Sequence, residues 1–133
     1  MELGENARRF LQQPRFAVVG TNPADGPPQL SVVWYRMDGD DLLFVFSRGS
    51  AKEKNLRRAP YLSACVEDGY RYVTLSGLAV IEEDEGTTRA LLRDLASRYL
   101  TPAEGEVWLA SDENSGGSVT VRLKPEHIVT YGI

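Results

Sequence analysis

Most of the chain alternates between apolar and polar residues in short runs, the pattern of β-strands with one buried face. The runs are rich in β-branched and aromatic residues, and turn-forming residues separate them. They comprise residues 15–21, 29–37, 41–47, 61–67, 70–82, 118–123 and 127–131. Because several runs are joined by short turns such as Asp38-Gly39-Asp40, the pattern predicts an antiparallel sheet.

Two local departures from this alternation suggest how the sheet is shaped. Leu42 to Phe46 is continuously apolar, which is typical of a strand covered on both faces. In the run 70–82 the apolar phase slips at Ser76-Gly77, and a glycine at such a slip predicts a β-bulge that bends the strand. Both features favour a sheet curled into a barrel, since closure removes exposed sheet edges.

Helical periodicity interrupts the strands in two longer segments. One helix is expected over 3–13 and a longer one over 84–100, and a proline follows each pattern. The stretch 104–117 fits neither a helix nor a strand, although Val107-Trp108-Leu109 is consistent with one buried turn. We find no repeat and no composition change, so residues 1–133 are expected to form a single domain.

The turn and short helix after the run 41–47 hold the clearest candidate for chemistry. Ser50 and Glu53 have the spacing of a capping box, so Ser50 is predicted to be the N-cap of this helix. Residues 48–58 contain five cations against one anion, Glu53. A helix N-terminus beside positive charge suits a phosphate group, because unpaired N–H donors and the helix dipole both attract anions. The alternative is an ordinary capped and solvated surface helix.

The overall composition limits the classes of function. The net charge of −4 argues against non-specific nucleic-acid binding, which requires a basic face. A single cysteine excludes an internal disulfide and a cysteine-cluster metal site. No apolar run approaches the length of a membrane span, and the acidic start of the chain does not have the pattern of a secretory signal. We therefore expect a soluble cytoplasmic protein without nucleic-acid or membrane partners.

The order and spacing of these segments resemble a known family. The succession FAVVGTNPADGPPQLSVVWYRMDGDDLLFVFSRGSAKEKNL, followed later by VTLSGLAVI, is similar to the pyridoxamine-phosphate-oxidase-like split β-barrel. The resemblance is strongest to its small members, which bind flavin mononucleotide (FMN) or the deazaflavin coenzyme F-420. It implies a mainly β fold with accessory helices (α+β), namely a split antiparallel β-barrel.

The resemblance also implies a cofactor site without a metal or a catalytic side chain. Residues of the second strand would lie alongside the cofactor ring, the turn after the third strand would supply hydroxyl and basic contacts, and Lys52 would bind the phosphate. The implied cofactor-binding residues are Ser31, Val32, Val33, Trp34, Ser47, Arg48, Ser50, Lys52 and Asn55. Cys65 is interpreted as a small buried hydrophobe, and His127 as part of the surface structure.

The function implied by the resemblance is that of an oxidoreductase. It would transfer hydride from the cofactor to a small organic acceptor such as a quinone or a tetrapyrrole, and it would be a homodimer with the cofactor at the interface. The GSAKxxNL run and the short chain favour coenzyme F-420 over FMN. A true pyridoxamine phosphate oxidase is not expected, because its C-terminal arginine and histidine have no match here. The alternative is a non-catalytic flavin carrier or an interaction module of the same fold.

Overall fold

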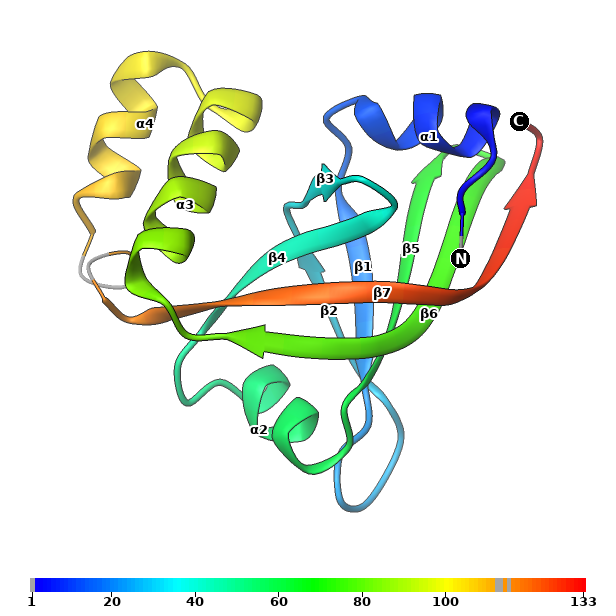
Figure 1. Cartoon of the computed structure of the whole chain (residues 1–133), viewed down its shortest axis with the longest axis horizontal. Helices are drawn as coiled ribbons and strands as arrows, with labels where there is room; N and C mark the ends of the chain where they lie inside the picture. The colour runs from blue at the N-terminus through cyan, green and yellow to red at the C-terminus, as the bar shows by residue number, and fades with distance from the viewer. Residues whose placement is uncertain (1, 112–113, 115) are drawn as a thin grey trace.

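The computed structural model describes residues 2–111, 114 and 116–133, and these form one curled antiparallel sheet with helices around it (Figure 1). The strand order is β2-β1-β5-β6-β7-β4-β3, and every neighbouring pair is antiparallel. The elements are α1 (Glu5–Gln12), β1 (Ala17–Thr21), β2 (Gln29–Val33), β3 (Arg36–Asp38), β4 (Asp41–Ser47), α2 (Ala51–Arg58), β5 (Tyr61–Asp68), β6 (Arg71–Glu82), α3 (Glu85–Tyr99), α4 (Pro102–Leu109) and β7 (Ser118–Tyr131). The predicted mainly β fold with accessory helices is confirmed.

The barrel is split between β2 and β3. These two strands are consecutive in the sequence but lie at opposite ends of the sheet order, and only Trp34 and Tyr35 join them. The prediction of a single strand over 29–37 was therefore wrong. Tyr35 explains the break: its side chain is fully buried, and its hydroxyl donates to the carbonyl of Leu11 at 2.9 Å. The chain leaves β2 to bury this ring and then begins β3.

The last strand is longer than expected. The sequence predicted two strands around Pro125, but Ser118–Tyr131 forms one strand, β7, with a register shift opposite Ser76/Gly77. This shift confirms the β-bulge. Gly77 is required there, because a Cβ at this position would lie 2.1 Å from the backbone oxygen of Lys124. The bulge gives the bend by which β6 and β7 wrap around the barrel.

The apolar run in β4 is covered on both faces, as predicted. Phe44 and Phe46 are fully buried in the barrel core. Leu43, on the opposite face, packs with Leu91 and Leu95 of α3. The helix α3 therefore covers the outer side of β4, and this second small core determines where α3 and α4 lie.

The stretch 104–117, which fitted neither a helix nor a strand, begins within the helix α4. Residues 112, 113 and 115 of this stretch lie outside the described residues. Thr101 caps α4, and the side chain of Glu104 closes a capping box with the Thr101 backbone. Pro102 occupies the first turn, where its missing N–H costs no hydrogen bond. In Figure 1 α3 and α4 form a helical hairpin beside β4, while α1 crosses one end of the barrel and α2 lies at the other. No helix in the described part of the chain is long and apolar enough to cross a membrane.

Candidate functional site

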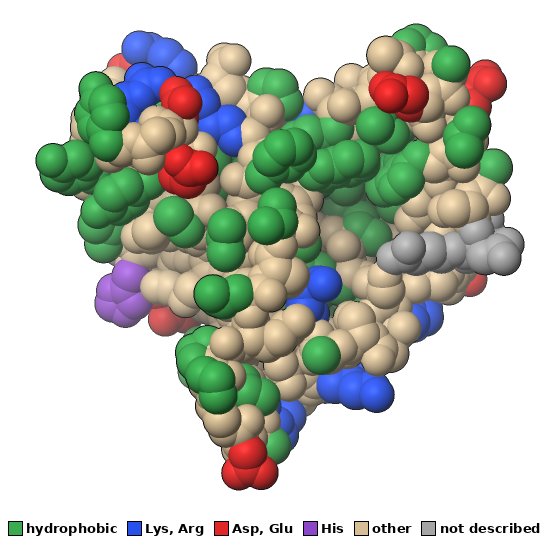
Figure 2. All heavy atoms as spheres, turned by 180° about the vertical axis from the view of Figure 1, so that it is seen from behind, with side chains coloured by type: hydrophobic (Ala, Val, Ile, Leu, Met, Phe, Trp, Pro, Cys, Tyr) green, Lys and Arg blue, Asp and Glu red, His purple; other side chains and the backbone are tan. Residues whose placement is uncertain are grey.

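A pocket with a volume of about 260 Å³ lies where the barrel is split. Residues from β2 and its crossover, β4, α2, α3, α4 and the start of β7 line it. Figure 2, which shows the molecule from behind, has hydrophobic side chains gathered in a hollow on this side. The lining residues are Val32, Val33, Trp34, Val45, Ser47, Lys52, Leu95, Trp108, Asn114 and Ser118.

The turn between β4 and α2 is built by a buried carboxylate. Ser50 is the N-cap of α2, as predicted, and its hydroxyl accepts from the Glu53 N–H at 3.3 Å. Glu53 in turn accepts from the N–H of Gly49 at 2.7 Å, one residue before the position that a strict capping box would use. Gly49 has a φ of +77°, which favours glycine. The hydrogen bond from Gly49, more than the ion pair with Arg57, holds the pKa of Glu53 below its usual value.

The positive segment 48–58 is partly neutralised by a residue outside it. Glu83, at the end of β6, pairs with Arg48 at 3.1 Å and with Arg57 at 3.0 Å. Lys52 is different: it lines the pocket, forms no ion pair within the described residues, and has its Nζ 5.3 Å from the centre of the Phe46 ring. Among the five cations of this segment, Lys52 is the one that lines the pocket, and it is the lysine that the resemblance assigned to a phosphate.

The other predicted site residues lie in two groups. Val32, Val33, Trp34 and Ser47 line the pocket together with Lys52. Arg48, Ser50 and Asn55 do not line it: Arg48 is engaged by Glu83 and by the carbonyl of Gly116, and Asn55 donates to Thr21 Oγ1 at 3.1 Å. Their assignment to the cofactor stays a prediction, and their observed contacts are structural.

Ser31 differs from the other predicted site residues in its hydrogen bonding. It does not line the pocket, yet its Oγ is buried and has no hydrogen-bond partner in the described part of the chain. Buried hydroxyls are normally satisfied, because leaving one unpaired costs free energy. Ser31 lies on β2, an end strand of the sheet whose outer backbone edge faces the split. An orphaned hydroxyl on this strand marks a place where a ligand group could complete the bonding.

An aromatic cluster forms one end of the pocket. Trp34 stacks on Tyr99 with ring centroids 4.9 Å apart and planes inclined by 9°. Trp108 meets Trp34 at 5.1 Å with an inclination of 51°. Five of the described lining residues were not predicted from the sequence: Val45, and Leu95, Trp108, Asn114 and Ser118, which come from segments far from β2. The only available signal was the apolar triplet around Trp108 in a stretch that had no clear periodicity.

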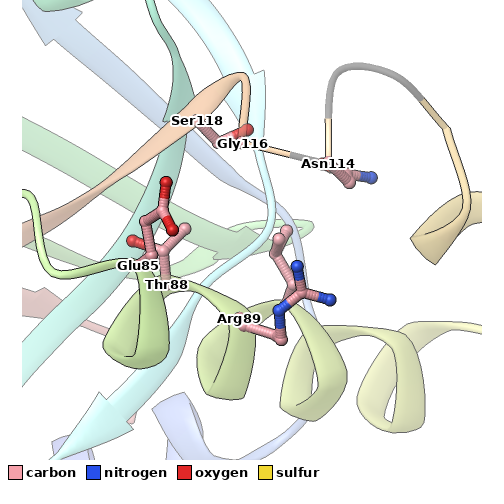
Figure 3. Close-up of a pocket in the computed structure, with 7 residues that line it drawn as sticks. Glu85, Thr88, Arg89, Asn114, Gly116 and Ser118 are labelled. Atoms are coloured by element: carbon pink, nitrogen blue, oxygen red, sulfur yellow. The ribbon is translucent and has the colours of Figure 1, made fainter.

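A smaller pocket of about 110 Å³ adjoins the first (Figure 3). Glu85, Thr88 and Arg89 project into it from the first turns of α3, opposite Asn114 and Ser118. Asn114 and Ser118 line both pockets, so the two are neighbours along the start of β7.

Cys65 lies on the outer face of β5, half-buried rather than fully buried as expected. Desolvation raises the pKa of its thiol, which disfavours the reactive thiolate.

Residues 3–132 match the family model described as pyridoxamine 5'-phosphate oxidase. The chain belongs to this family. The match spans nearly all of the described structure, so the resemblance stated from the sequence is confirmed.

Relatives of the chain include deazaflavin-dependent reductases. A coenzyme F-420-dependent biliverdin reductase of Mycobacterium tuberculosis is 28% identical over 102 residues, which are 75% of this chain and 74% of the relative. A solved F-420 reductase has a TM-score of 0.79 at 25% identity and covers 96% of this chain and 98% of its own. A conserved hypothetical protein of Mycobacterium tuberculosis has a TM-score of 0.81 at 25% identity, covering 97% and 84%.

The residues of the pocket fit a flavin or deazaflavin. Lys52 and Ser47 offer a cation and a hydroxyl beside the N-terminus of α2, which suits a phosphate. Val45, Leu95 and the aromatic cluster offer an apolar surface to a ring. The unsatisfied Oγ of Ser31 lies on the strand that borders this space.

Proposed function

We propose that the chain is an oxidoreductase that binds a flavin or deazaflavin in the pocket at the barrel split and passes hydride to a small organic acceptor. The observation that carries this proposal is Lys52, a cation without an ion pair in the described residues, at one end of an otherwise largely apolar pocket. Coenzyme F-420 is the favoured cofactor, because reductases that use it are among the relatives. Quinones and tetrapyrroles are the acceptors we would test first.

The chain's own residues would bind and orient rather than exchange protons. The cofactor, when bound, supplies the hydride chemistry. Lys52, Ser47 and the first turn of α2 would hold the phosphate, while β2 and the aromatic cluster would fix the plane of the ring and keep water from it. Among the described residues that line the pocket, Lys52 is the only one with an ionisable side chain. Hydride transfer by the cofactor would need no acid–base pair from the protein.

We further propose that the protein is a homodimer whose second copy completes the pocket. The outer faces of five neighbouring strands carry a row of mostly apolar side chains, aligned by the sheet register: Val32, Val18, Cys65, Thr74 and Val129. Val32 is 66% exposed and also lines the pocket. The volume of about 260 Å³ is below the range of roughly 300–1,000 Å³ that is typical of small-molecule sites. A second copy on this face would cover Val32 and deepen the pocket.

Cofactor titration tests the proposal. Purified protein is titrated with coenzyme F-420 and, separately, with FMN, and binding is followed by visible absorption. Lys52→Ala should weaken binding by about 1.5–3 kcal/mol, the scale of a hydrogen bond to a charged group. Lys54→Ala is the matched control, because Lys54 is exposed on the same helix and does not line the pocket.

Two results would change the assignment. Equal affinities of the parent and Lys52→Ala would remove Lys52 from the site. If the reduced cofactor binds but passes hydride to none of the quinones and tetrapyrroles offered, the result favours the alternative of a non-catalytic flavin carrier.

A further inference from the structure

The two tryptophans of the chain meet at one end of the pocket although they are far apart in the sequence. Trp34 belongs to the crossover between β2 and β3, and Trp108 to α4. Both are only partly buried and both line the pocket, so each presents indole surface to a ligand. Val107, the neighbour of Trp108 on α4, is 76% exposed and does not line it. The orientation of α4 therefore turns Trp108, and not the neighbouring apolar residue, towards the site.

The orientation of Trp34 is fixed by contacts that need no ligand. Tyr99 stacks parallel to it, and the Tyr99 hydroxyl donates to the carbonyl of Arg15 at 2.6 Å and accepts from the N–H of Tyr35 at 3.3 Å. These bonds hold the Tyr99 ring against the backbone next to Trp34. A surface held in place before binding loses little conformational entropy when a ligand arrives.

The aromatic end and the charged end of the pocket lie a short distance apart along β4. Val45 packs against the same small apolar core as the aromatic rings, and Ser47, two residues further on the same face, lines the pocket together with Lys52. Two residues of a strand span about 7 Å. The pocket thus offers an indole surface and a cation to different parts of one ligand, or to two ligands bound side by side.

We propose that Trp34 and Trp108, whose rings contact each other, form one wall of a slot that selects planar conjugated rings, with Trp108 as the specificity-determining residue and Tyr99 as a positioning residue. This inference rests on the proposed function and assigns it a ligand class: an extended aromatic or conjugated plane instead of a compact aliphatic molecule. Offset or tilted contact with an aromatic face strengthens binding beyond the effect of buried area. Such a plane is present both in a flavin or deazaflavin and in a quinone or tetrapyrrole acceptor.

Three variants test the slot. Trp108→Leu keeps an apolar side chain but removes the aromatic face, Trp108→Phe keeps a smaller aromatic face, and Val107→Ala is the matched control on the same helix. The variants and the parent are titrated with FMN and with coenzyme F-420, and the cofactor-loaded proteins are titrated with the planar quinone menadione. Inorganic phosphate, which has no ring, is titrated as a competitor for Lys52.

The slot predicts a defined order of affinities. Trp108→Leu should raise the dissociation constant for a ring ligand about tenfold, Trp108→Phe by less than about threefold, and Val107→Ala not measurably. Phosphate should bind all four proteins equally, because Trp108 is not part of the charged end. A loss confined to the FMN and F-420 titrations assigns the slot to the cofactor ring, and a loss confined to menadione assigns it to the acceptor.

Two outcomes would overturn the inference while leaving the proposed function intact. If the parent binds a cofactor and Trp108→Leu binds every ring ligand as tightly, Trp108 selects nothing. If Trp108→Leu and Trp108→Phe lose affinity equally, the tryptophan fills space and its aromatic face is not used. If the parent binds neither cofactor, the proposed function fails, and menadione titrated into the cofactor-free parent and variants still tests the slot.

The parent protein provides a measurement that does not depend on the folding of any variant. Because both tryptophans line the pocket, saturation with FMN or menadione should quench most of the intrinsic tryptophan emission, whereas inorganic phosphate should leave it unchanged. Unchanged emission at saturation with a ring ligand would contradict the slot.

Discussion

At the scale of single residues, Glu53 organises the turn that positions Lys52. Its carboxylate is nearly inaccessible to solvent, accepts the Gly49 N–H and pairs with Arg57. Arg57 also pairs with Glu83, the residue that follows β6. The Arg57 side chain therefore links α2 and its preceding turn to the end of β6. Glu53→Gln would keep an oxygen that can accept from Gly49 but would remove the charge.

We predict that the stability contributed by Glu53 depends on pH. The pKa of Glu53 is lowered in the folded protein, first by the Gly49 N–H bond, so the unfolded chain binds its proton more readily. The contribution is complete above the ordinary pKa of 4.5 and is lost as the pH falls through the lower folded value. At pH 7 Glu53→Gln should be less stable than the parent by about 1–2 kcal/mol.

Urea unfolding of the parent and of Glu53→Gln at several values of pH measures this contribution. The difference between the two proteins should shrink as the pH is lowered from 7 to about 3. Glu126→Gln serves as the control, because Glu126 is exposed. A constant difference across this range would contradict the assignment.

At the scale of elements, local patterns predicted the strands, but tertiary burial decided where they break. The run 29–37 contains no turn-forming break, and nothing in it showed that Tyr35 is buried beneath α1 while Trp34 turns towards α3. Conversely, Pro125 suggested two strands, yet the bulge opposite Gly77 accommodates it within β7. The slip at Ser76-Gly77 was predictable because glycine at a phase change has a local physical meaning.

Gly77 provides a prediction at this scale. In Gly77→Ala the new Cβ would meet the backbone oxygen of Lys124 at 2.1 Å and the backbone nitrogen of Glu126 at 2.9 Å, so the bulge must shift. We expect the free energy of unfolding to fall by about 1–3 kcal/mol. In Gly105→Ala the nearest atom is the Cβ of Ala96 at 3.4 Å, an ordinary van der Waals contact between α4 and α3. This control should be neutral or slightly stabilising, by up to about 1 kcal/mol.

The denaturant midpoints of the two glycine variants, compared with that of the parent, measure these changes in stability. Gly77→Ala with the midpoint of the parent would show that β6 and β7 do not need the bulge.

At the scale of the whole molecule, one part of the candidate site could be predicted from the sequence and another part could not. The segment from Ser47 to Lys52 was identifiable because its capping and charge are local. Leu95 and Trp108 were not, because they reach the pocket only after α3 packs on Leu43 of β4. The family resemblance assigned the cofactor to β2. The opposite wall of the pocket depends on packing between segments that are distant in the sequence, and the spacing of residues along the chain does not encode that packing.

The outer face of the sheet provides the test of assembly. Light scattering at micromolar concentration should give a mass of about twice 14.8 kDa for the parent. Leu30 is 66% exposed and borders, with Val18 and Cys65, a groove of about 310 Å³ on this face. Leu30→Asp should therefore shift the protein towards the monomer, because a buried unpaired charge opposes association. Val107→Asp places the same charge on an exposed residue of α4 that does not line this groove, and should leave the dimer intact.

A parent mass near 14.8 kDa would contradict the dimer and with it the completion of the pocket by a second copy.

The pairing of β4 also has a consequence for synthesis of the chain. Along Leu42 to Ser47, β4 pairs with β7, from Leu42 opposite Leu123 to Ser47 opposite Ser118. While the ribosome is still making α3 and α4, the most apolar strand of the protein has only the short β3 beside it. An unpaired apolar strand is a template for aggregation, and pairings between distant segments form slowly. The nascent chain is thus most vulnerable immediately before its last strand emerges, and the pocket is among the last parts to assemble.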